Sequence, residues 1–141
     1  MRLQLVGGGR MGEALLAGLL AADWAPPGDL RVVEALAPRR AELVERFAGV
    51  VVTDTVGPAE GTVLATKPGD IPAACAALGP DAGRVLSIAA GVRLADLEGA
   101  LPAGPESRSL CCLLLRSPLH GRVLLPSSTV QRLPGPFLTA C

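Results

Sequence analysis

The fold is decided by the stretch Arg2-Leu-Gln-Leu-Val-Gly-Gly-Gly-Arg-Met-Gly12, in which an apolar run meets four glycines. The run predicts a β-strand over 2–6, and the glycines predict a tight turn directly after it. Beyond the turn, apolar residues recur at about four-residue intervals, at Met11, Leu15, Leu19 and Ala22. This spacing is typical of an amphipathic helix that buries those side chains.

The turn itself, Gly7 to Gly12, fits the pattern G-x-G-x-x-G between a strand and a helix. In that setting Gly7 permits the tight turn, Gly9 lets the backbone approach a pyrophosphate, and Gly12 lets the helix pack against the strand. The helix would also present free N–H groups and the positive end of its dipole to the ligand. We therefore expect a dinucleotide-binding loop, the alternative being a glycine-rich turn with no ligand.

Strands and helices continue to alternate through the first hundred residues. The sequence predicts strands over 30–33, 50–53, 62–66 and 85–89, and helices over 38–47, 71–78 and 94–101. Near-continuous apolar strands separated by helices are typical of a parallel sheet covered on both faces. The predicted fold class is therefore α/β, a doubly wound parallel sheet of the Rossmann type.

Glu34 follows the second predicted strand and could accept hydrogen bonds from the ribose hydroxyls of an adenosine, which would favour NAD. Arg39 and Arg40 follow soon after and could instead hold a 2′-phosphate, which would favour NADP. The alternative for at least one of these arginines is a place on a solvated helix face. At this point the cofactor is either NADP or NAD.

Two further segments end predicted strands at the edge of the sheet where ligands bind. Ala65-Thr66-Lys67-Pro68 would face the crevice, or Lys67 would simply be an exposed lysine in an ordinary turn. The small residues of Ser87–Val92 would leave room for a ring or a ribose, or would reflect tight packing between strand and helix.

Composition narrows the class of protein. The chain of 141 residues suits one domain, and its 13 Lys+Arg balance 13 Asp+Glu. A balanced charge argues against nucleic-acid and anionic-membrane binding, and the single histidine argues against a multi-histidine metal site. The longest uncharged apolar run, 14–22, is too short to span a bilayer, so we expect a cytoplasmic protein with no membrane partner.

The charge and the composition of the chain both change near residue 104, although the whole-chain average does not show it. Residues 1–104 hold nine Lys+Arg and twelve Asp+Glu, whereas residues 105–141 hold four Arg, one Glu, a single Ala and three of the four Cys. Five prolines interrupt the second part, which predicts an irregular tail. Within it, 110–115 and 122–125 could form strands, but the sequence identifies no partner for either.

The first part resembles the cofactor-binding domain of the pyrroline-5-carboxylate reductase family. The resemblance rests on Val6–Gly12, on Ala65–Pro68 and on Ser87–Val92, in family order. It implies NAD(P)H-dependent reduction of the C=N bond of 1-pyrroline-5-carboxylate to L-proline, in a homo-oligomer. The implied cofactor-binding residues are Val6, Gly7, Gly8, Gly9, Arg10, Met11, Gly12, Glu34, Ala65, Thr66, Lys67, Pro68, Ile88, Ala89 and Ala90.

The chain also departs from that family. Members often carry Ser or Thr where Glu34 stands, and they continue after the third motif into a further strand and a helical domain that forms the dimer and the substrate pocket. Neither is recognisable after Gly104, so we name no catalytic residue and expect a sheet edge left unpaired, weak cofactor binding and no turnover. We expect the tail, 105–141, to come from a shifted reading frame or a mis-assembled end, and translation of the other two frames tests this.

Two other functions stay open. The chain could be a free-standing dinucleotide-binding module with no chemistry of its own. It could also be a reductase of another substrate, because reductases of 2-hydroxy acids or deazaflavin cofactors share this kind of fold.

Overall fold

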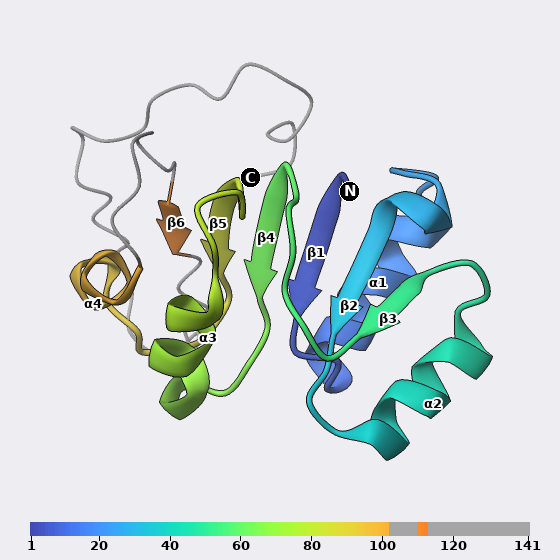
Figure 1. Ribbon diagram of the computed structural model, residues 1–141, viewed down its shortest axis with the longest axis horizontal. Helices are drawn as coiled ribbons and strands as arrows, with labels where there is room; N and C mark the ends of the chain where they lie inside the picture. Colours follow the sequence, from blue (N-terminus) through green and yellow to red (C-terminus); the bar gives the residue numbers. More distant parts are fainter. Residues whose placement is uncertain (102–109, 113–141) are drawn as a thin grey trace, which may run out of the picture.

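The computed structural model describes residues 1–101 and 110–112, and these residues build one parallel β-sheet flanked by helices (Figure 1). The strand order is β3-β2-β1-β4-β5-β6, so the chain moves outward from β1 in one direction and then returns to build the other half. The strands are β1 (Leu3–Val6), β2 (Leu30–Val33), β3 (Val51–Thr53), β4 (Gly61–Leu64), β5 (Arg84–Ser87) and β6 (Leu110–Cys112). This order confirms the predicted doubly wound sheet.

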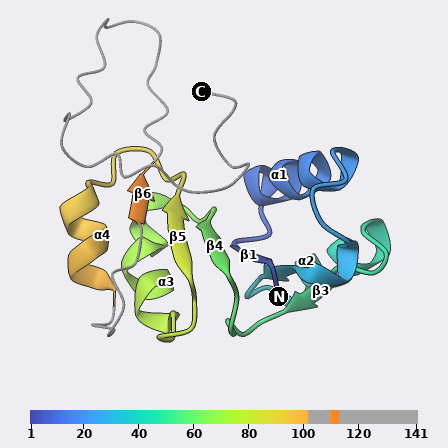
Figure 2. The ribbon, with the colours of Figure 1, turned by 90° about the horizontal axis from the view of Figure 1, so that it is seen from above.

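Four α-helices connect these strands. They are α1 (Arg10–Ala21), α2 (Ala37–Arg46), α3 (Ile71–Ala77) and α4 (Leu94–Ala100). Figures 1 and 2 show α1 and α2 beside the β1–β3 half of the sheet, and α3 and α4 beside the β4–β6 half. Short 3₁₀ turns at Pro27–Asp29 and Pro68–Asp70 precede β2 and α3, where each proline fixes the first position of the turn.

The core consists of two apolar clusters, one on each face of the sheet. Leu16 of α1 and Leu43 of α2 pack with Leu5 of β1 in the first cluster. Leu97 of α4 and Ile71 of α3 pack in the second. The two helix pairs therefore cover opposite faces, because successive residues of a strand point to opposite sides.

A buried polar contact ties the two halves of the sheet together. The Gln4 side-chain amide on β1 donates to the Thr62 hydroxyl on β4 at 2.9 Å, and that hydroxyl donates to the Ala82 carbonyl at 2.7 Å. Gln4 and Thr62 are almost fully buried, and each finds a partner, as buried polar groups require. The junction between β1 and β4, where the chain reverses its direction of winding, is thus cross-linked by side chains as well as by backbone.

One expectation about the second part of the chain is wrong. Leu110–Cys112 is a strand, and it pairs in parallel with β5 through the register Val85↔Leu110, Leu86↔Cys111 and Ser87↔Cys112. The β5 edge is therefore not left unpaired, and the new strand lies within 110–115, the segment that the sequence allowed as a strand. No local sequence pattern identifies this partner, because the pairing depends on a neighbour more than twenty residues away. The rest of the predicted tail, 122–125 included, lies outside the described residues.

The other predicted elements agree with the structure to within one or two residues, but the buried face of α1 does not. Met11 was expected in the core and is 50% exposed, whereas Leu16 is fully buried. Gly12 and Leu16 form the buried line of α1, with Leu15 and Leu19 partly buried against the same cluster. Met11 instead lies at the open end of the helix, beside the glycine turn.

Candidate functional site

Three of the predicted segments meet where β1, β4 and β5 end. The Gly7 amide donates to the Val33 carbonyl at 2.8 Å, and the Ala65 amide donates to the Val6 carbonyl at 2.8 Å. The Ile88 amide continues the row by donating to the Leu64 carbonyl at 3.1 Å. The glycine turn, the segment after β4 and the segment after β5 therefore share the carboxyl edge of the sheet, where open α/β sheets bind ligands.

Gly7 and Gly12 make the turn compact. Gly7 has a φ of +108°, and a Cβ on it would stand 2.8 Å from the Ala65 carbonyl oxygen. A Cβ on Gly12 would overlap the Gly7 carbonyl oxygen. Gly9 differs from both, since a Cβ on it would meet nothing within 4 Å. The turn is thus closed at its two ends and open at Gly9, the position expected to face a pyrophosphate.

Gly8 has a role that the sequence did not predict. A Cβ on it would come within 2.6 Å of the Leu43 side chain and 3.1 Å of the Glu34 carboxylate, so α2 packs directly on the loop. Its amide donates to Glu34 Oε2 at 2.9 Å, and its carbonyl accepts from Arg39 Nε at 2.8 Å. Both backbone polar groups of Gly8 are therefore held by side chains that follow β2.

Glu34 lies directly beyond the end of β2, as predicted, with its carboxylate against the glycine turn. Its second oxygen, Oε1, accepts from the Leu36 amide at 2.9 Å. The Glu34 amide in turn donates to the Thr53 carbonyl at the end of β3, at 2.9 Å. The carboxylate is consequently fixed by two backbone amides and by its own strand, next to the loop expected to receive a dinucleotide.

Arg39 and Arg40 do not lie on a solvated helix face. Both side chains are about three-quarters buried: Arg39 reaches the glycine turn and α1, and Arg40 reaches the end of β2. Arg39 donates to the Glu13 carboxylate on α1, and it also donates to Glu42 Oε2 at 2.6 Å. The hydrogen bond from Arg39 to Glu13 lowers the pKa of the Glu13 carboxyl. The alternative of an exposed helix face is therefore wrong for both arginines.

Thr66, in the segment after β4, carries a polar atom with no partner. Its Oγ1 is buried and makes no hydrogen bond among the described residues. The side chain lies next to the turn, with its methyl group 3.1 Å from where a Cβ of Gly7 would stand. Lys67 is exposed and directly precedes the following 3₁₀ turn, which begins at Pro68.

The segment after β5 packs tightly. Ala89 is 4% exposed and belongs to the core cluster, whereas Ala90 is exposed at the edge. The Ser87 hydroxyl accepts from the Ala89 amide at 3.3 Å, and Gly91 turns the chain with a φ of +79°. The small residue Ala89 thus serves packing, whereas Ala90 is exposed and Ile88 packs, partly buried, against the first core cluster.

These residues fit a dinucleotide. The 12-residue helix α1 begins at Arg10 with Gly9 as its N-cap, and no side chain of the described residues caps it, so its first amides are not covered by a local side chain. Among residues 1–101 and 110–112, Gly9 has open space beside it, the Thr66 hydroxyl has no hydrogen-bond partner, and a fixed carboxylate lies beside the turn. A pyrophosphate at the start of α1 and a ribose at Glu34 would use all of these groups.

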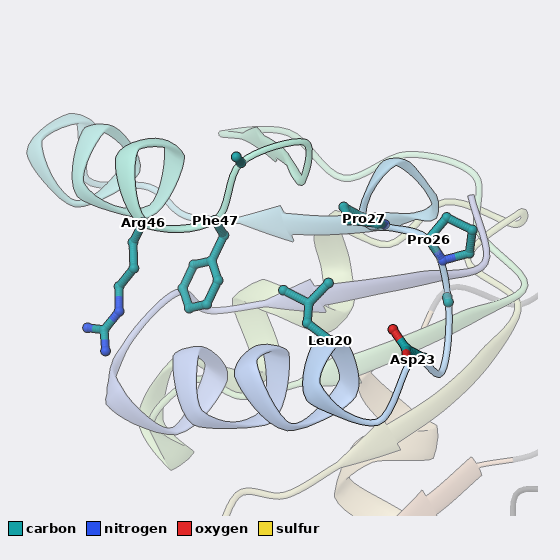
Figure 3. Close-up of a pocket in the computed structure, with 8 residues that line it drawn as sticks. Leu20, Asp23, Pro26, Pro27, Arg46 and Phe47 are labelled. Atoms are coloured by element: carbon teal, nitrogen blue, oxygen red, sulfur yellow. The ribbon is translucent and has the colours of Figure 1, made fainter.

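A separate pocket of about 530 Å³ lies at the opposite edge of the sheet (Figure 3). In Figure 3 Leu20 from the last turn of α1 and Phe47 after α2 point toward one another, with Pro27 just before β2. Arg46 extends away from them. Because Pro27 precedes β2, this pocket lies where the strands begin and takes no part in the glycine-turn site.

In the part of the chain that the structure describes, no helix is long and apolar enough to cross a membrane. No group of three or more His, Cys, Asp or Glu side chains in 1–101 and 110–112 is placed to hold a metal ion.

Sequence comparisons find relatives of this region. Residues 2–91 match the family model described as NADP oxidoreductase, coenzyme F420-dependent. The chain is 41% identical over 113 residues to a pyrroline-5-carboxylate reductase from Mycobacterium leprae, and 35% identical over 106 residues to one from Pseudomonas aeruginosa. These alignments cover 73% and 71% of the chain but 38% of each relative, so the chain spans well under half the length of those proteins.

A solved structure shares the fold. The crystal structure of Plasmodium falciparum pyrroline carboxylate reductase with NADP bound superposes with a TM-score of 0.57. The superposition covers 75% of this chain and 39% of that one, with 19% sequence identity. At that identity the likeness concerns the arrangement of strands and helices.

Proposed function

Because the chain belongs to the family described as NADP oxidoreductase, coenzyme F420-dependent, we propose that residues 1–104 are the dinucleotide-binding domain of a pyrroline-5-carboxylate reductase. The observation that carries the proposal is the glycine turn, closed at Gly7 and Gly12 and open at Gly9. The reductase relatives supply the substrate class. Bound NAD(P)H would deliver hydride to the C=N carbon, while the chain holds its pyrophosphate and ribose.

The proposed cofactor-binding residues are those at the carboxyl edge of the sheet. The amides at the start of α1 would face the pyrophosphate, and Glu34 the adenosine ribose. The segments after β4 and β5 would line the second ribose and the nicotinamide. Thr66 Oγ1 supports this placement, because a ligand hydroxyl or phosphate would give this buried atom the hydrogen bond it lacks.

Of the two nicotinamide dinucleotides, NADH and NADPH, we propose NADH as the preferred cofactor. The Glu34 carboxylate is fixed by the Gly8 and Leu36 amides, so it cannot easily turn away from a ligand. It can accept hydrogen bonds from ribose hydroxyls, whereas the 2′-phosphate of NADPH would bring a second negative charge against it. This assignment differs from the cofactor named in the family description and in the Plasmodium structure.

Binding is tested by calorimetric titration of the 141-residue chain with NADH and NADPH. We expect NADH to bind at least about tenfold more tightly, a difference of about 1.4 kcal/mol. Gly9→Ala should weaken NADH binding by about tenfold or more without lowering the melting temperature, because its Cβ enters only the open space. Gly18→Ala is the matched control, because it lies nine residues or about two and a half turns further along the chain and its Cβ also meets no described residue within 4 Å. Equal NADH affinity in the two variants would contradict the pyrophosphate site.

The reductase activity is tested by following NADH consumption with 1-pyrroline-5-carboxylate. The chain is compared with versions in which the codons after 104 are read in the other two frames. Binding by all versions with turnover by a frame-corrected one supports the proposal. Binding without turnover in every version would favour a dinucleotide-binding module instead.

A further inference from the structure

The two arginines that could receive a 2′-phosphate are already committed to other groups. Arg39 uses all three of its guanidinium nitrogens: Nε donates to the Gly8 carbonyl at 2.8 Å, Nη1 donates to Glu42, and Nη2 donates to Glu13. Two carboxylates and a carbonyl therefore surround one positive charge. Three of the five guanidinium N–H groups are thereby occupied, and a phosphate at Arg39 would compete with two carboxylates for the same positive charge.

Arg40 is also engaged, through hydrogen bonds from one guanidinium nitrogen and an ion pair at another. Its Nη1 donates to the Glu34 carbonyl at 2.8 Å and to the Ala35 carbonyl at 2.7 Å. Its Nη2 lies 3.6 Å from Asp54 Oδ2, just after β3. Arg40 thus binds the backbone carbonyls between β2 and α2, and its charge is paired with Asp54, which follows the neighbouring strand β3.

The charges around the end of β2 consequently favour an uncharged ligand group. Four carboxylates gather there, from Glu13, Glu34, Glu42 and Asp54, against three guanidinium groups, because Arg46 also pairs with Glu13. Arginine is the side chain best suited to a phosphate, since its planar fork can bind two oxygens at once. Here the positive charges of Arg39 and Arg40 already face carboxylates of the chain itself.

We propose that Glu42 and Asp54 are specificity-determining residues, which keep Arg39 and Arg40 from binding a 2′-phosphate and so reinforce the choice of NADH made by Glu34. The inference rests on the proposed function, because it concerns the adenosine end of that same site. This proposal has a consequence that a cofactor choice made by Glu34 alone would not have. Replacing Glu34 will not by itself produce an NADPH-binding protein, because the neighbouring arginines stay neutralised.

The experiment measures NADH and NADPH dissociation constants by calorimetry at one fixed salt concentration. The chains are the unaltered protein, Glu34→Ser, the pair Glu42→Gln with Asp54→Asn, and the three changes combined. We expect Glu34→Ser to lower the NADPH-to-NADH ratio of dissociation constants by less than tenfold. The three changes together should lower that ratio by at least a further tenfold, because the freed guanidinium groups can then bind the phosphate.

Two controls separate this effect from simpler ones. Glu45→Gln removes one negative charge from α2 at an exposed residue with no ion pair among the described residues, and it should leave the ratio unchanged. If Glu34→Ser does not fold, Glu34→Gln replaces it, because that side chain keeps an oxygen to accept from a backbone amide. Melting curves establish which variants are folded before titration.

The outcomes distinguish the two proposals. If the unaltered chain binds neither dinucleotide, the proposed function fails and this inference falls with it. If NADH binds, but the amide substitutions change the ratio no more than Glu45→Gln does, the inference alone is overturned. An NADPH preference already present in Glu34→Ser would also overturn it, because the arginines would then be free without any change at Glu42 or Asp54.

Discussion

Two glycines of α1 occupy opposite environments, although both stand in the same helix. Gly12 lies against the backbone of the glycine turn, where a Cβ would overlap the Gly7 carbonyl oxygen. Gly18 is exposed, and a Cβ there would meet nothing within 4 Å. The first glycine is needed for close packing, and the second only weakens the helix.

The same substitution should therefore have opposite effects at the two positions. We expect Gly12→Ala to lower the free energy of unfolding by about 1–3 kcal/mol, because the turn must move to admit the methyl group. Gly18→Ala should raise that free energy by about 1 kcal/mol, since alanine favours the helix. Urea denaturation of both variants measures the difference. A destabilisation of equal size at Gly18 would show that helix contacts of another kind are involved.

Helices α1 and α2 are linked by a chain of charges on the face that they share. Glu13 of α1 pairs with Arg39 at the start of α2 and with Arg46 at its end. These contacts hold the pKa of the Glu13 carboxyl below its ordinary value, with the Arg39 hydrogen bond as the largest cause. The link thus connects both ends of α2 to the first turn of α1.

This link gives the stability a pH dependence of known sign. Because the folded protein lowers the pKa of Glu13, the stabilisation is complete above the ordinary value of 4.5 and is lost as the pH falls below it. We expect Glu13→Gln to lower the melting temperature at pH 7 and to lie closer to the unaltered chain as the pH drops below about 4.5.

Thermal melting at several pH values checks this, with Glu45→Gln as the control from an exposed position on α2. A melting difference for Glu13→Gln that stays constant through the acid range would mean that the ion pairs contribute nothing measurable. In that case the two helices would be joined by the apolar contacts of Leu16 and Leu43 alone.

Among the described residues, the edge strands of the sheet are β3 and β6, and β6 comes from the part of the sequence with the altered composition. β6 pairs with three residues of β5. It therefore supplies hydrogen-bond partners to a strand that would otherwise form the edge.

A chain that ends at Gly104 tests the role of β6. We expect the amides of β5 to exchange with deuterium faster in that shortened chain, because one side of the strand loses its partner. The amides of β1 and β2, at the centre and the other half of the sheet, should exchange as before. Unchanged exchange throughout β5 would contradict the pairing of Leu110–Cys112 with it.

The sequence was enough to predict the sheet, the glycine turn and the place of Glu34, because each depends on residues close together in the chain. Apolar runs define the strands, and glycine spacing defines the turn. The site residues after β1, β4 and β5 meet for a related reason, since parallel strands end at one edge.

What the sequence did not predict depends on contacts across the chain. The partners of Arg39 and Arg40 come from α1 and from the end of β3, so spacing alone suggested two free arginines. Met11 and Leu16 are both apolar, and only the packing of α1 on the sheet decides which is buried. The role of Gly8 has the same origin, because Leu43 and Glu34 reach it from elsewhere.

Both backbone polar groups of Gly8 are held by side chains, the amide by Glu34 and the carbonyl by Arg39. The turn is therefore ordered before any ligand binds, so the conformational entropy of the loop is lost on folding and not on binding. A dinucleotide would then lose its own freedom on binding but would demand little more from the loop. The entropy of association should accordingly become less favourable in Arg39→Ala, in which the loop must be ordered by the ligand itself.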